Sequence, residues 1–61
     1  MNEQDIAIAE VVIMRARDLR EHGFPLDEQL AEFLQRIVTH ADRFPEEMVA
    51  EARRLLEVAS A

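Results

Sequence analysis

Apolar residues recur every three or four positions through most of the chain, which is the spacing of one face of an α-helix. The pattern is cleanest over residues 25–42, and it extends over residues 3–21 and 45–59. These periods predict three helices with those approximate bounds. The apolar stripe of residues 25–42 consists of Leu26, Leu30, Phe33, Leu34, Ile37, Val38 and Ala41. The apolar stripe of residues 45–59 consists of Met48, Val49, Ala52, Leu55, Leu56 and Ala59.

Two Phe-Pro steps, Phe24-Pro25 and Phe44-Pro45, divide the chain at the ends of these segments. Proline fixes its own φ and biases the preceding residue away from the α region, so each step predicts a helix boundary with proline at the first helical position. Gly23 is expected to end the first helix in a left-handed conformation, and Asn2 is expected to cap its start. The chain is therefore predicted to be one all-α domain over residues 1–61, a three-helix up-down-up bundle.

The first segment carries more apolar surface than one stripe. Residues 6–13 are rich in Ile and Val and also suit a β-strand, but the chain offers no second strand to pair with their backbone groups, so a helix is predicted. Beyond its broad apolar face, Ala7, Val11 and Met14 form a second stripe at i, i+4 and i+7, with Ile8 at the edge. This stripe either packs within the chain, between the two other helices, or contacts a second protein chain.

A chain of 61 residues with 49% hydrophobic residues can form one core. A domain of this size buries only about 60% of the surface of its unfolded chain, so its stability is marginal. We therefore expect Ala7, Ile8, Val11 and Met14 to form a protein interface, either with a second copy or with a different, larger protein. If the contact is with a copy, a two-fold homodimer is the commonest arrangement.

Acidic residues come first and arginines last in each predicted helix. The chain has 13 Asp and Glu against 7 basic residues and a net charge of -6. Because this order suits the helix dipole, much of the acidity stabilises the helices. In an up-down-up bundle the first and third helices begin at the same end, where they are expected to form an acidic pole. Asp27 and Glu28 would partly neutralise the opposite, arginine-rich end. The acidic pole comprises Glu3, Asp5, Glu46, Glu47 and Glu51.

No motif for catalysis, cofactor binding or metal binding is present. The absence of cysteine excludes disulfides, thiolate metal sites and cysteine nucleophiles. His22 and His40 have no metal-ligand spacing around them, although His40 with Asp42 leaves open a site shared between chains. Paired carboxylates such as Glu28 and Glu32 are expected on solvated faces. Thr39 and Ser60 lack a base positioned to activate them. We predict a non-enzymatic protein with no catalytic residues, cofactor, metal or small-molecule substrate.

Charge and hydropathy also bear on location and partners. The acidic start lacks the basic region of a signal peptide, and the apolar stretch 6–14 is too short to cross a membrane, so a cytoplasmic protein with no membrane contact is predicted. The acidic balance argues against nucleic acid. In a helix-turn-helix the recognition helix would begin Pro45-Glu46-Glu47, which repels phosphates.

These observations predict a small acidic protein-interaction module. The favoured role is a regulator or inhibitor that binds a larger protein stoichiometrically, as a homodimer. Phage- or plasmid-encoded inhibitors, antitoxins and immunity-type proteins share this size and acidity. The alternatives are a structural homo-oligomerisation domain and, with less support, a helix-turn-helix DNA-binding repressor.

Overall fold

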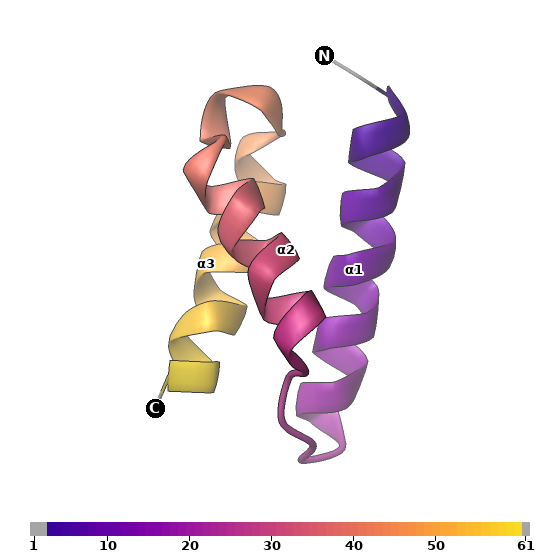
Figure 1. The fold of residues 1–61 in the computed structure, drawn as a ribbon, viewed down its shortest axis with the longest axis vertical. Helices are drawn as coiled ribbons and strands as arrows, with labels where there is room; N and C mark the ends of the chain where they lie inside the picture. The colour runs from indigo at the N-terminus through magenta and orange to yellow at the C-terminus, as the bar shows by residue number, and fades with distance from the viewer. Residues whose placement is uncertain (1–2, 61) are drawn as a thin grey trace.

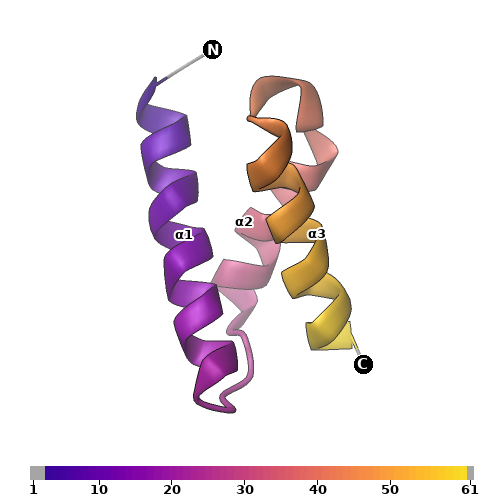
Figure 2. The same ribbon diagram turned by 180° about the vertical axis from the view of Figure 1, so that it is seen from behind.

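The computed structural model describes residues 3–60, with side chains described for residues 3–57. Helix α1 spans Glu3–Glu21, α2 spans Glu28–Thr39 and α3 spans Glu46–Ser60, with a short 3-10 helix, η1, at Ala41–Arg43. Helices α1 and α3 run in the same direction and α2 runs between them in the opposite direction (Figures 1 and 2). The predicted three-helix up-down-up bundle is confirmed. Asn2 and the side chains of Ala59 and Ser60 lie outside the described residues.

The core lies along the line where the three helices meet. Helices α2 and α3 pack against one another more extensively than either packs against α1. Leu34 and Ile37 of α2 are the largest side chains that are fully enclosed, and Leu26, Phe33, Phe44 and Met48 cover the edges of the core. Most residues of the predicted stripes therefore converge on this core, but Ala41 is exposed and lies in η1, outside α2. The buried side chains among the described residues are Ala9, Ile13, Ala16, Leu34, Ile37, Val49, Ala52 and Leu55.

Helix α1 ends at a glycine, as its sequence predicts. Gly23 has φ of +77°, in the left-handed region that residues with a Cβ avoid. The Phe24 N–H donates to the Leu19 carbonyl at 2.8 Å, and the Gly23 N–H donates to the Arg20 carbonyl at 3.1 Å. These two bonds form a Schellman motif, which satisfies carbonyls that the helix end leaves without partners. The chain can therefore reverse direction at once.

Helix α2 begins three residues later than the sequence suggested. Pro25 precedes the helix, and Asp27 is the N-cap, with its carboxylate accepting a hydrogen bond from the Leu30 N–H at 2.8 Å. An aspartate at this position satisfies an orphan N–H of the first turn and fixes the start at Glu28. Pro25 is left in the extended lead-in to the helix.

The second corner also shortens α2, which ends at Thr39 instead of continuing to residue 42. Phe44 has extended backbone angles, φ −128° and ψ 154°, because a residue before proline is disfavoured in the α region. The 3-10 turn of η1 makes the connection without any positive φ. Pro45 directly precedes α3, and its carbonyl accepts hydrogen bonds from the N–H groups of Met48 and Val49 at 3.0 and 3.1 Å.

Candidate interaction surface

The outer side of α1 carries exposed apolar residues. Val11 and Met14 each expose 66% of their surface, and Ala7 is also exposed. On the opposite side of the same helix, Ala9 and Ala16 are fully buried. We call Ala7, Val11 and Met14 the outer stripe. The outer stripe is therefore not packed against α2 or α3, because these helices cover only the other side of α1.

Two hollows border the outer stripe. Ile8, which is 42% exposed, lines a hollow of about 540 Å³ between α1 and the C-terminal end of α2. Met14 lines a second hollow of about 380 Å³ between α1 and α3, together with Pro45 and Met48. The predicted interface residues therefore extend from one hollow to the other across the exposed side of α1. A partner that covered this side could also fill both edges.

Four of the five acidic-pole residues lie at one end of the bundle. Glu3 and Asp5 are in the first turn of α1, and Glu46 and Glu47 are in the first turn of α3. Both turns lie at the end of the bundle that also holds the α2–α3 corner (Figure 1). Glu51 lies more than a turn further along α3, where it has two arginine partners.

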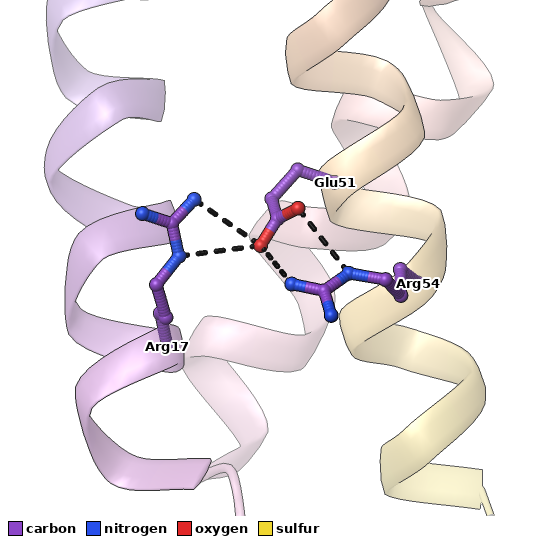
Figure 3. Close-up of polar contacts among 3 residues, drawn as sticks. All are labelled: Arg17, Glu51 and Arg54. Carbon is purple, nitrogen blue, oxygen red and sulfur yellow. Dashed lines mark hydrogen bonds and ion pairs between the residues drawn. The ribbon is translucent and has the colours of Figure 1, made fainter. Parts of the chain in front are cut away.

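The carboxylate of Glu51 links α1 to α3 (Figure 3). Arg54 donates to it twice, from Nη2 to Oε1 at 2.6 Å and from Nε to Oε2 at 3.3 Å. From α1, Arg17 places Nε and Nη2 at 3.3 and 3.2 Å from Oε1. The hydrogen bonds from Arg54, reinforced by Arg17, lower the pKa of Glu51, and the same contact raises the pKa of Arg54. This carboxylate is therefore neutralised within the molecule.

The basic side chains at the α2–α3 corner were not anticipated from the sequence. Arg36, His40 and Arg43 line the larger hollow beside Asp5. Their spacing of i, i+4 and i+7 is the signal that could have revealed them. Cations suit the negative end of the α2 dipole, and the Arg36 guanidinium also lies 5.8 Å from the centre of the Phe33 ring. The end that holds the acidic pole is consequently mixed in charge.

The histidines lie at helix ends. His22 follows α1, where its Nδ1 lies 2.8 Å from the Asp18 carbonyl oxygen and 3.5 Å from the Asp18 carboxylate. The hydrogen bond to that carbonyl, followed by the charge of Asp18, raises the pKa of His22. Cationic imidazole is thus favoured at the negative end of α1, as its position predicts. His40 is the C-cap of α2. Within the described residues, no group of three or more His, Asp or Glu side chains could hold a metal ion.

Comparison with known proteins gives no relative from which a function could be transferred. No family model matches the chain, and neither the curated proteins nor the solved structures contain a match. Among the described residues, no helix combines the length and apolar character that crossing a membrane requires. The exposed side of α1 is therefore the feature from which a function is argued.

Proposed function

We propose that this protein is a non-enzymatic, cytoplasmic interaction module that works by stoichiometric contact with another protein chain. In this role it regulates or inhibits the protein that it binds, and the binding surface is the outer stripe of α1 with Ile8 at its edge. The observation that carries the proposal is the exposure of Val11 and Met14, 66% each, next to one another on the side of α1 that faces no other helix.

The exposed apolar residues are concentrated rather than scattered. Single exposed apolar side chains are common on soluble proteins, but three of the four large ones described here, Ile8, Val11 and Met14, are on α1. Val11 and Met14 are three residues apart, so their side chains adjoin on one helix face. Apolar anchors at this spacing are how a helix docks on another protein surface. Met14 adds an unbranched, adaptable side chain.

A second candidate function is structural homo-oligomerisation. The order of charges along α1 favours it, because the acidic first half of one copy complements the arginine-rich second half of another. A copy and a larger protein would use the same stripe, so the two functions differ in the occupant of the surface. The mass of the protein that contacts position 11 distinguishes the two functions.

Photo-crosslinking from position 11 tests the proposal. A photoreactive amino acid replaces Val11 in one protein and Gln35, an exposed residue of α2, in the matched control. Both proteins are irradiated in a lysate of the source cells, and the masses of the crosslinked adducts are measured by mass spectrometry. We expect a discrete adduct from position 11 only. The adduct must also disappear when Met14→Glu is added, because a buried charge opposes docking. Equal labelling from both positions, or labelling that is insensitive to Met14→Glu, would overturn the proposed function.

A further inference from the structure

We propose that the outer stripe pairs with the same stripe of a second copy in antiparallel orientation, with Val11 of each copy against Met14 of the other. The inference rests on the proposed function, because it names the occupant of the same surface. Three features of α1 support this pairing: the residue pattern of the stripe, the charges beside it and the charge difference between the two halves of the helix.

The spacing of residues 7, 11, 14 and 18 on the exposed side is symmetric about the midpoint between Val11 and Met14. Continuing the stripe at the same spacing gives Gln4, Ala7, Val11, Met14 and Asp18, an alternation of three and four residues that presents one face to a partner helix. With a two-fold axis midway between Val11 and Met14, Val11 of each copy contacts the partner's Met14. The same axis sets the small Ala7 beside the partner's Asp18. Apolar residues thus meet at the centre and polar residues meet solvent at the ends.

Glu10 and Arg17, which flank the centre of the stripe, are complementary in this register. Glu10 and Arg17 lie on the same side of the stripe, seven residues apart, and an antiparallel copy brings Glu10 of each chain near the partner's Arg17. The Glu10 side chain has no hydrogen bond or ion pair with any of the described residues. Arg17 keeps half of its side-chain surface exposed while it contacts Glu51. Two symmetric ion pairs therefore flank the apolar centre. At the solvent-exposed ends of the pair, Glu21 of each copy lies near the partner's Glu3, and solvent screens the repulsion between these carboxylates.

The two halves of α1 select the orientation. The first half contains Glu3, Asp5 and Glu10 and no basic residue, a net charge of -3, whereas the second half contains three arginines, Arg15, Arg17 and Arg20, and two acids, Asp18 and Glu21, a net charge of +1. A parallel pair sets the acids of one copy beside the acids of the other and aligns the two helix dipoles. An antiparallel pair sets acids beside arginines and opposes the dipoles. Both terms favour the antiparallel pair.

The expected dimer is weak. A standard interface covers about 800 Å² of each partner, which is less than a fifth of the 4546 Å² surface of this molecule. A contact confined to one side of a single helix is smaller than a standard interface, so we expect a dissociation constant in the micromolar range or above. Association is therefore to be measured by sedimentation up to about 1 mM protein. A larger protein that uses the outer stripe must displace the copy.

Cysteine crosslinking distinguishes the orientations, and the chain has no cysteine of its own. In the antiparallel pair, position 7 of one copy adjoins position 18 of the other, whereas the two copies of position 7 are about 16 Å apart along the axis. Under mild oxidation, a mixture of Ala7→Cys and Asp18→Cys proteins should give the mixed disulfide. Each variant alone should give no more dimer than Gln35→Cys, the exposed control on α2. Ready disulfides from each variant alone would indicate a parallel pair and overturn the inference.

The second test measures the molecular mass of the protein in solution by sedimentation. Val11→Glu should raise the dissociation constant of the dimer about tenfold or more, because it buries a charge at the centre, while Gln35→Glu should leave it unchanged. Circular dichroism checks that both variants remain helical. A chain that stays monomeric and forms no disulfide above the control contradicts the inference. If position 11 still crosslinks to a larger protein, the proposed function stands without the dimer; if it crosslinks to nothing, both fail.

Discussion

Helix α2 is 12 residues long and fully buries Leu34 and Ile37, whereas α1 is 19 residues long and buries only Ile13 and two alanines. The large apolar residues of α2 lie on its inner side or at the edges of the core. Those of α1 are divided, with Ile13 inside and Val11 and Met14 outside. A helix with one apolar side is explained by the bundle to which it belongs, whereas a helix with two points to a contact outside that bundle.

The largest test of this difference replaces one apolar residue on each helix by alanine. Leu34→Ala leaves a cavity at a fully buried site and should lower the free energy of unfolding by about 3 kcal/mol. For a 61-residue domain, whose whole stability is about 3–9 kcal/mol, this loss removes a third or more of the total. Val11→Ala should cost less than about 0.5 kcal/mol. Urea denaturation of dilute, monomeric protein measures both. Equal losses would assign Val11 to the core and remove the contrast.

The ends of the two helices differ as well. Helix α1 is terminated by Gly23, whose φ is positive, whereas α2 is followed by a 3-10 turn in which no residue has a positive φ. Gly23→Ala should lower the free energy of unfolding by about 1 kcal/mol, since a Cβ at this position would contact nothing within 4 Å and the cost is that of the left-handed backbone alone. Gly23→Asn should lose less, because asparagine tolerates this conformation. Thermal unfolding of both variants measures the difference, and no loss in Gly23→Ala would show that the turn relaxes.

The sequence predicts helices and helix ends correctly where the signal is local to a few residues. Apolar spacing identified three helices, and Gly23 marked the end of the first, because both signals are local. The Phe-Pro step predicts that α2 starts at residue 25, but the helix starts at Glu28 because the side chain of Asp27 caps it. The second stripe of α1 identified the exposed residues, since its members have no place on a single inner face. What binds there depends on another surface, and only the charge order of α1 gives information about it.

Contacts between helices were the part that the sequence could not supply. The order of charges along α3 predicts Glu51 in the acidic pole with Glu46 and Glu47, yet its partners are Arg54 on the same helix and Arg17 on α1. The distance of 34 residues between Arg17 and Glu51 is bridged only when α1 and α3 adopt one particular axial register. Neither helix encodes that register by itself. It is set by packing around α2.

The Glu51 contact gives the most specific prediction about how α1 is held. Glu51→Gln should lower the free energy of unfolding at neutral pH by about 1 kcal/mol, because the carboxylate is largely shielded and bonded to two guanidinium groups. Glu47→Gln, an exposed change one turn earlier on α3, should cost less than about 0.5 kcal/mol.

Acidification should remove the advantage of the wild-type protein over Glu51→Gln. The pKa of Glu51 is lowered in the folded protein from an ordinary value of 4.5, so its ionised form stabilises the fold fully only above that value. Below it the unfolded chain takes up the proton first, and the stabilisation disappears as the pH falls through the folded pKa. Urea denaturation between neutral pH and about pH 2 should therefore show the two proteins converging. A difference that stays constant across this range would mean that packing, and not the charge of Glu51, joins α3 to α1.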